Sequence, residues 1–321
     1  MIPLVSMVIP IWNGASRIHI PLEALANQSV SCEIIVVNNA STDDLAGAVQ
    51  LCPAWSEMQA RGMTCKIVHE ARAGATYARL RGLLEATSEL VCFLDDDNGP
   101  EPGYIEAGVT ALADPTVGIL ISRIYPVYEQ QPPRSMIKRE HLLAINFGLG
   151  EKRIEWDASV AFAPTVTAGM WVRRQAFLDA VPWRYPEKLL ADRKGGSLAC
   201  GGDIEIGFLI GRAGYKRVYS PNLRLKHYIP MARLRSSYFC RLILGIVRSE
   251  ITLRERYLPV PNPSRGRAAA LGRLFFACIA TPALVLGRDG MREALFVLVS
   301  RWACVQGPYP VAASAAEPSA A

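Results

Sequence analysis

The chain has 321 residues, of which 50% are hydrophobic and 20% are charged, with 25 glycines, 22 prolines and a formal net charge of +6 at pH 7. This composition provides enough apolar side chains for a large core, so we expect one large domain with an extension, or two domains. It excludes a collagen-like fibre and a repeat array, because the glycines and prolines follow no period.

The cysteines and the N-terminus predict a cytoplasmic protein. The 8 cysteines are scattered and form no Cys-x-x-Cys pair, which favours buried thiols in a reducing compartment over disulfides or a zinc site. The N-terminal stretch MIPLVSMVIPIWN lacks a positively charged region and a small-residue cleavage site, and Pro10 interrupts it. It is therefore predicted to be a first strand and not a signal peptide.

Short strands and helices are predicted to alternate along the first third of the chain. Residues 4–11 and 33–37 are rich in β-branched side chains, and residues 18–28 between them have helical apolar spacing. A third strand is predicted at 66–70, a helix from Gly74 onward, and a fourth strand at 90–94. This alternation predicts an α/β fold with a parallel sheet covered by helices, which binds ligands beyond the carboxyl ends of its strands.

Polar residues follow each of the four predicted strands. Asn13 follows the first strand, Asn38 the second, Glu70 the third and Asp95 the fourth. Because the carboxyl ends of parallel strands lie at one edge of a sheet, we expect these residues to border a single crevice.

Three adjacent aspartates end the fourth strand in the segment LVCFLDDDNGPEP, residues 90–102. In an extended chain Asp95 and Asp97 share a face, while Asp96 points away. Neighbouring carboxylates repel each other, and a hard divalent cation that also holds phosphate oxygens would offset the repulsion. The alternative is an acidic turn exposed to solvent.

Six segments in order resemble the family 2 glycosyltransferases of the GT-A fold, and the resemblance covers about residues 4–260. The segments are VIPIWNG (8–14), IIVVNNASTD (34–43), HEARAGATYARLRG (69–82), CFLDDDNGPEP (92–102), TAGMWVRRQAF (167–177) and CGGDIEIGFLIGRAGYKRVYSPNLRLKHYIP (200–230). The resemblance implies a Rossmann-like, mostly parallel central sheet flanked by helices, with a helical C-terminal extension. It also implies a nucleotide-diphosphate sugar as donor, with Mg²⁺ or Mn²⁺ held against the diphosphate.

The resemblance assigns the donor side residue by residue. The residues expected against the nucleobase, or close to it, are Pro10, Ile11, Asn13, Asn38 and Arg79. The family usually has Asp at position 38, and the amide found here adds two hydrogen-bond donors and removes a charge. A UDP-sugar is favoured by the habit of the family.

The resemblance also assigns the metal side. Asp95 and Asp96 are expected to face the ribose and the metal, with Asp97 as the principal metal ligand. His227, in LKHYIP, is a further candidate ligand, although a histidine between Lys226 and Tyr228 also suits a packed or surface position.

An inverting transfer needs a base for the proton of the attacking hydroxyl, and the resemblance implies an acidic residue in a Gly-Glu-Asp type motif. In GGDIEIG this motif places Asp203 at the base position and Gly202 where an acid is often found. Glu205 is the reserve candidate for the base. The alternative is that these acids only stabilise the N-terminus of a helix.

Trp171 is the candidate contact for the acceptor, because it lies in the segment that borders the acceptor site in relatives. The alternative, which the residue type favours, is a place in the core.

The C-terminal region is basic and apolar. Residues 212–273 contain 14 Lys and Arg against two acidic residues, so this segment carries +12 and the remainder of the chain −6. Residues 236–258 are predicted to form an amphipathic helix, and the apolar stretch 268–287 is interrupted by Arg273 and Pro282. This pattern suits attachment to an anionic membrane surface at the inner face of the cell membrane, or packing on the catalytic domain or in a dimer. Nucleic-acid binding is not expected, because no known module accompanies the charge.

The predicted organisation is a catalytic domain over residues 1–235, with a nucleotide-sugar half at about 1–100 and an acceptor half at about 101–235. A helical extension over 236–305 and a disordered tail over 306–321 follow. The predicted function is metal-dependent, inverting sugar transfer to a hydroxyl of a saccharide or lipid-linked acceptor in surface polysaccharide or glycolipid assembly. The alternatives are a non-catalytic sugar-nucleotide-binding subunit and a nucleotidyltransferase of related fold.

Overall fold

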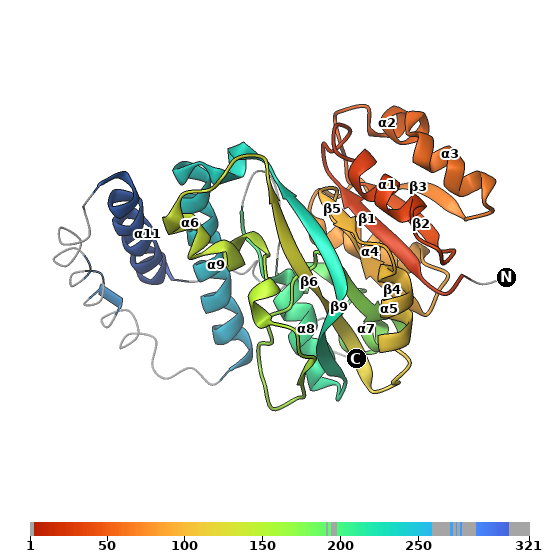
Figure 1. Ribbon diagram of the computed structural model, residues 1–321. Coiled ribbons are helices and arrows are strands. Elements are labelled where there is room, and N and C mark those ends of the chain that lie inside the picture. Colours follow the sequence, from red (N-terminus) through yellow and green to blue (C-terminus); the bar gives the residue numbers. More distant parts are fainter. Residues whose placement is uncertain are drawn as a thin grey trace.

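The computed structural model describes residues 3–190, 192–193, 198–258, 270–271, 274, 277 and 287–307. Within these residues the chain forms one large mixed sheet with helices against both faces, and two long helices lie at one end of the molecule (Figure 1).

The N-terminal part alternates strands with helices, as predicted. Its elements are β1 (Ser6–Ile11), α1 (His19–Ala26), β2 (Glu33–Asn38), α2 (Leu45–Leu51), α3 (Pro53–Ala60), β3 (Cys65–His69), α4 (Ala75–Glu85) and β4 (Leu90–Phe93). The four strands are parallel, in the order β3-β2-β1-β4. The helices α2 and α3 were not predicted.

The second part of the chain extends the sheet with antiparallel and parallel strands. Its strands are β5 (Asn98–Pro100), β6 (Val117–Tyr128), β7 (Ile154–Trp156), β8 (Met170–Arg173) and β9 (Lys216–Ile229). Its α-helices are α5 (Tyr104–Ala111), α6 (Arg134–Ile137), α7 (Arg174–Ala180), α8 (Gly202–Arg212), α9 (Ser236–Tyr257) and α11 (Gly287–Gln306). Its 3₁₀ helices are η1 (Glu140–Leu143), η2 (Phe147–Leu149), η3 (Pro186–Lys188) and η4 (Met231–Leu234). The full strand order is β3-β2-β1-β4-β8-β6-β9-β5, with β7 paired to β9, so the predicted α/β class with a mostly parallel sheet is confirmed.

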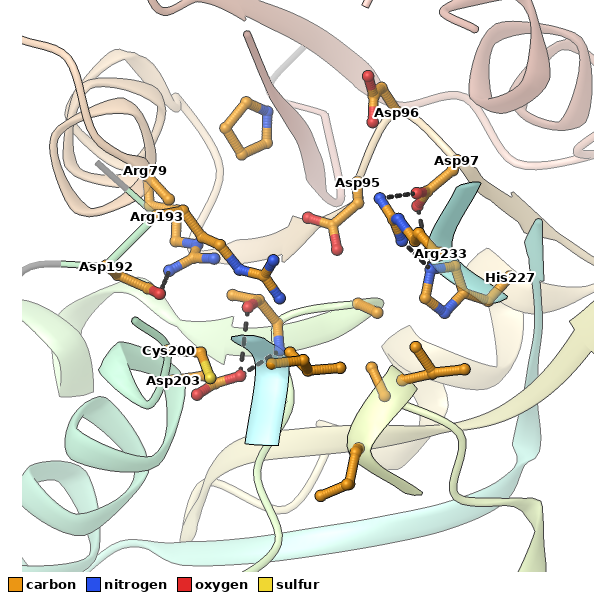
Figure 2. A pocket seen from close by; sticks show the side chains of 18 of the residues that line it. Arg79, Asp95, Asp96, Asp97, Asp192, Arg193, Cys200, Asp203, His227 and Arg233 are labelled. Carbon is orange, nitrogen blue, oxygen red and sulfur yellow. Dashed lines mark hydrogen bonds and ion pairs between the residues drawn. The ribbon is translucent and has the colours of Figure 1, made fainter. Parts of the chain in front are cut away.

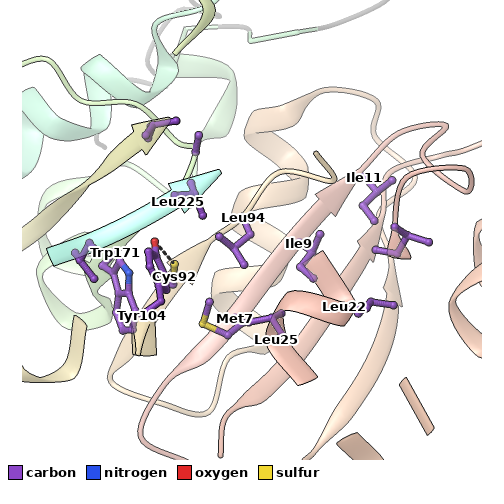
Figure 3. Close-up of a cluster of buried hydrophobic side chains, with 14 of the residues drawn as sticks. Met7, Ile9, Ile11, Leu22, Leu25, Cys92, Leu94, Tyr104, Trp171 and Leu225 are labelled. Carbon is purple, nitrogen blue, oxygen red and sulfur yellow. Dashed lines mark hydrogen bonds between the residues drawn. The ribbon is translucent and has the colours of Figure 1, made fainter. Parts of the chain in front are cut away.

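The core has a layer on each face of the sheet, because the central parallel strands are buried on both sides. Figure 3 shows one layer, in which Met7 and Ile9 of β1 lie among Leu22 and Leu25 of α1. On the opposite face Val8 packs against α4. The approach of α4 is so close that a Cβ at Gly82 would lie 2.1 Å from a methyl carbon of Val8.

The helices α9 and α11 pack against each other, and α9 also packs on the main body. Phe239, Leu242 and Ile243 of α9 are buried in the same cluster as the first strand. The predicted amphipathic face of this helix is therefore covered by protein. Among the described helices, none is long and apolar enough to cross a bilayer. The apolar stretch 268–287 and the predicted disordered tail lie largely outside the described residues.

Candidate active site

A polar cavity of about 230 Å³ lies beyond the carboxyl ends of β1 and β4 (Figure 2). Elements from the whole chain line it, including α4, the loop before α8, the end of β9 and the first turns of α9. Its acidic, basic and histidine lining residues are Arg79, Asp95, Asp96, Asp97, Asp192, Arg193, Asp203, His227 and Arg233. The cavity therefore combines carboxylates with arginines and one imidazole.

The three aspartates after β4 have three different environments. Asp96 points away from the cavity centre (Figure 2), and its carboxylate accepts a hydrogen bond from Arg17 Nη2 at 2.5 Å. Asp97 is 2% exposed; its Oδ2 lies 2.7 Å from Arg233 Nη2, and its Oδ1 lies 3.4 Å from His227 Nε2. The carboxylate of Asp95 faces the cavity, and among the described residues no hydrogen bond reaches its oxygens.

Because their environments differ, the pKa values of the three aspartates are shifted in different directions. Burial, followed by the charge of Asp97, raises the pKa of Asp95, and the same two causes raise the pKa of Asp96 to about 6. Burial also acts to raise the pKa of Asp97, but the charges of His227 and Arg233 outweigh it and hold that pKa well below its usual value. Asp97 is thus the acid most firmly kept ionised.

The strand β9 brings His227 to the aspartates. It pairs with β5 so that His227 lies opposite Asn98, directly after the acidic triplet. His227 is 4% exposed, and its Nδ1 is buried without a hydrogen-bond partner in the described part of the chain. The imidazole is therefore held with Nε2 toward Asp97 and Arg233.

The donor set fits a divalent metal ion in its chemistry. A carboxylate and an imidazole are ligands that Mn²⁺ accepts, and Asp97 and His227 already lie next to each other. Among the described residues no three acidic, histidine or cysteine side chains are grouped closely enough to hold an ion by themselves. The Arg233 guanidinium contacts both Asp97 and His227, so it supplies the positive charge between them.

Asp203 lies on the opposite side of the cavity, in the first turn of α8. The helix begins after Gly201, whose φ of 117° is a conformation that favours glycine. The Asp203 carboxylate accepts a hydrogen bond from the backbone N–H of Thr167 at 3.2 Å. Burial, followed by the negative charge of Asp192, raises the pKa of Asp203 to about 6, and Arg79 opposes this rise.

Glu205, the reserve candidate for the base, has a different environment from Asp203. It is fully buried and does not line the cavity. Its carboxylate accepts hydrogen bonds from Arg256 Nη1 at 2.5 Å, the Tyr257 hydroxyl at 2.7 Å and the Leu190 backbone N–H at 2.6 Å. Glu205 therefore ties α8 to the end of α9 and to the loop that carries Asp192.

A second cavity of about 190 Å³ adjoins the first along Pro10, Arg79, Asp95 and Arg193. Pro10 and Ile11, both predicted near the nucleobase, line it together with Trp12, whose side chain is 56% exposed. An aromatic side chain beside a narrow cavity is suited to stacking on a planar ring.

The two predicted asparagines hold the loops around this second cavity. Asn13 Oδ1 accepts a hydrogen bond from the backbone N–H of Thr42 at 2.8 Å, and Asn38 Oδ1 accepts one from that of Ser41 at 3.0 Å. Neither asparagine lines either cavity. Asn39, which sequence reasoning missed, lines the second cavity and accepts a hydrogen bond from the N–H of Gly74 at 2.9 Å.

Trp171 lies in the core and not at the cavity. It is fully buried on β8, where its ring lies 5.8 Å from that of Tyr104. A Cβ at Gly108 would approach the Trp171 ring to 2.3 Å, so this glycine opens the space for the indole. Leu142 and Leu143 of η1 and Leu242 of α9 line the cavity instead, and they give it an apolar wall.

Three further cavity residues, Asp192, Arg193 and Arg233, escaped the sequence analysis. Each lies in a loop or a 3₁₀ turn without apolar periodicity. Arg193 has a φ of 48°, which is uncommon for a residue other than glycine and gave no signal in the sequence. The one available signal was the arginine six residues after His227 in the basic segment.

The family is decided by a match to the whole N-terminal part of the molecule. Residues 6–180, more than half of the chain, match the model of the family described as Glycosyl transferase family 2. The chain is a family 2 glycosyltransferase.

Curated proteins and solved structures are similar to this family 2 glycosyltransferase. The putative glycosyltransferase EpsH of Bacillus subtilis is 28% identical over 151 residues, a match that spans 42% of this chain and 42% of EpsH. Curated relatives are therefore matched over less than half of their length.

Solved structures share the fold over nearly the whole chain. A mannosyltransferase of Pyrobaculum calidifontis in complex with GDP-Man and Mn²⁺ has a TM-score of 0.60 at 20% identity, covering 94% of this chain and 86% of that one. TarS residues 1–349 of S. aureus, in complex with UDP-GlcNAc, have a TM-score of 0.51 at 13% identity, covering 95% and 92%. These likenesses establish a GT-A-like fold for the family 2 member described here.

Proposed function

We propose that the chain transfers a sugar, with inversion, from a nucleotide-diphosphate donor to a hydroxyl group of an acceptor. The observation that carries this proposal is the arrangement of one cavity. Asp203, an acid with a raised pKa, lies across it from Asp95 and from the Asp97–His227 pair, on the fold of a glycosyltransferase family.

The donor nucleoside is proposed to occupy the second cavity. Pro10 and Ile11 provide its apolar wall, and Trp12 is available to stack on the base. Since structural neighbours bind GDP-Man and UDP-GlcNAc, both bases are candidates, with uridine favoured by the family resemblance. The diphosphate would extend into the first cavity, where Arg79 and Arg193 line both spaces.

Mg²⁺ or Mn²⁺ is proposed to be held by Asp97 and His227, with Asp95 facing the same space. When bound, such an ion neutralises the negative charge of the departing nucleoside diphosphate. Arg233 would then exchange its contact with Asp97 for a phosphate oxygen of the donor, with which its guanidinium can pair.

Asp203 is proposed as the general base. It takes the proton from the acceptor hydroxyl while that oxygen forms a bond to the anomeric carbon. The bond between this carbon and the diphosphate oxygen breaks, and the electron pair leaves with the diphosphate. A carboxylate with a pKa of about 6 is a stronger base than an ordinary aspartate and is still ionised at neutral pH.

The acceptor is proposed to be a saccharide or a lipid-linked saccharide. The leucine wall formed by Leu142, Leu143 and Leu242 gives the cavity an apolar side beside α9. On α11, Met291, Leu295 and Trp302 are exposed next to Arg301. This surface suits peripheral contact with an anionic membrane at the inner face of the cell, where lipid-linked acceptors would be available.

The proposal can be tested by measuring nucleotide binding and donor hydrolysis by the purified full chain, with GDP-mannose and with UDP-GlcNAc, each in the presence and absence of Mn²⁺. We expect metal-dependent nucleotide binding by calorimetry and slow donor hydrolysis, with hydrolysis reduced at least a hundredfold in Asp203→Asn. Binding without turnover, unchanged by this substitution, would show a binding subunit. Pyrophosphate release from a nucleoside triphosphate would show a nucleotidyltransferase.

A further inference from the structure

Asp192 is a buried acid at the candidate active site that the family resemblance does not assign. It is 3% exposed in the loop between η3 and α8, and its Oδ2 lies 2.7 Å from Arg79 Nη1. Its Oδ1 is buried and has no hydrogen-bond partner in the described part of the chain. Asp192 and Asp203 line the same cavity (Figure 2).

The glycine at position 202 explains how two acids fit side by side. A Cβ at Gly202 would lie 3.1 Å from Asp192 Oδ2 and 3.3 Å from the Asp192 Cβ. The absence of a side chain at this position therefore makes room for the Asp192 carboxylate beside the first turn of α8. The Asp192 carboxylate therefore lies in space that a side chain at position 202 would need.

Arg79 lies close to three carboxylates of the cavity. It is 8% exposed, and it interacts electrostatically with Asp192, Asp95 and Asp203. A buried arginine with three carboxylates around it is held in place by the one that it contacts directly, and that contact is with Asp192. Removing the Asp192 charge would leave Arg79 free to act on the other two.

We propose that Asp192 is a positioning residue of the transfer reaction, which holds Arg79 in the cavity and acts on the base Asp203 through its negative charge. This inference rests on the proposed function in one respect, namely that Asp203 takes the proton of the attacking hydroxyl. A purely structural role for Asp192 would hold the loop in place without changing how Asp203 titrates.

The test is a titration of the Asp203 carboxyl group in the full chain by ¹³C NMR, with labelled aspartate and assignment from Asp203→Asn. We expect a midpoint near 6 in the wild type. In Asp192→Asn we expect the midpoint to fall by about one pH unit, because a like charge is lost and Arg79 is released. The double variant Asp192→Ser/Gly202→Glu, which moves the carboxylate to α8, should restore the wild-type midpoint.

The same shift should appear in the acid limb of the rate of donor hydrolysis with GDP-mannose or UDP-GlcNAc and Mn²⁺. An unchanged midpoint in folded Asp192→Asn overturns the inference. If Asp192→Asn does not fold, the double variant decides: a wild-type midpoint supports the inference, and a lowered midpoint overturns it. Full hydrolysis by Asp203→Asn would instead refute the proposed base, and the NMR midpoint would still report on Asp192.

Discussion

If Asp97 holds the proposed divalent ion, Arg233 competes with that ion, so removing Arg233 should strengthen metal binding by the free protein. The guanidinium Nη2 lies 2.7 Å from a carboxylate oxygen of Asp97, a residue that is 2% exposed, so the two groups form a close ion pair. A charge-assisted contact of this kind contributes about 1.5–3 kcal/mol, and each 1.4 kcal/mol is a factor of ten in affinity. An ion at the Asp97 carboxylate would compete with this contact. Arg233→Gln should therefore bind Mn²⁺ about tenfold to a hundredfold more tightly than the wild type.

The assay is a titration of the full chain with Mn²⁺ without nucleotide, with free Mn²⁺ measured by electron paramagnetic resonance. Arg235→Gln is the matched control, because Arg235 is an exposed arginine in the same segment and lines neither cavity. The control should bind Mn²⁺ with the same affinity as the wild type, because an exposed charge outside the cavity contributes little to the binding free energy of the ion. Equal or weaker Mn²⁺ binding by Arg233→Gln would refute the idea that this arginine occupies the metal position.

Three further predictions concern single side chains. Donor hydrolysis should rise with pH through about 6 and level off above 7, because Asp203 must lose its proton to act as a base and its pKa is raised to about 6; a limb near 4 in the pH–rate profile would contradict this. Trp12→Ala should weaken binding of UDP or GDP by about fivefold to 150-fold in calorimetry, as expected for the loss of about 1–3 kcal/mol of base stacking, and unchanged affinity would exclude stacking. Glu205→Ala should lower the free energy of unfolding in urea by about 1–3 kcal/mol, because it removes a fully buried carboxylate that accepts hydrogen bonds from the Leu190 N–H and the Tyr257 hydroxyl and pairs with the partly exposed Arg256. Glu250→Ala, which removes an exposed pair within one helix, should change that energy by less than about 1 kcal/mol, and equal effects of the two variants would show that the Glu205 network does not stabilise the fold.

The first four strands could be predicted because their signals are local. Each is a short β-branched run followed by polar residues, and each was placed within two residues of its observed ends. The helices α2 and α3 had local signals that were missed. Asp44 caps α2 by accepting a hydrogen bond from the N–H of Gly47, and Pro53 begins α3 at a position where proline is favoured.

The ion-pair partners of the charged cavity residues could not be predicted, because the fold brings together residues that are far apart in the sequence. Arg79 forms an ion pair with Asp192, 113 residues further along the chain, and Glu205 forms one with Arg256, 51 residues further along. Nothing in the local sequence distinguishes Asp203, which faces the cavity, from Glu205, which is two positions further along the same helix and faces away from it. Two positions along a helix differ by about 200° around its axis, so the side chain of Glu205 points toward α9 when Asp203 faces the cavity. Only the packed structure shows which of the two acids faces the cavity.

The acidic triplet that first indicated a metal site is stabilised in the free protein by arginines. Asp96 is paired with Arg17, and Asp97 is paired with Arg233. In the described residues Asp95 has no direct side-chain partner, and its carboxylate faces the cavity. These ion pairs offset part of the repulsion between the neighbouring carboxylates, while burial and the charge of Asp97 still raise the pKa of Asp95. An ion held by Asp97, as proposed, would compete with Arg233, and the exchange would become favourable when a diphosphate is present to receive the released guanidinium. Metal and donor binding should therefore strengthen each other, because each provides a charge that the other leaves unpaired.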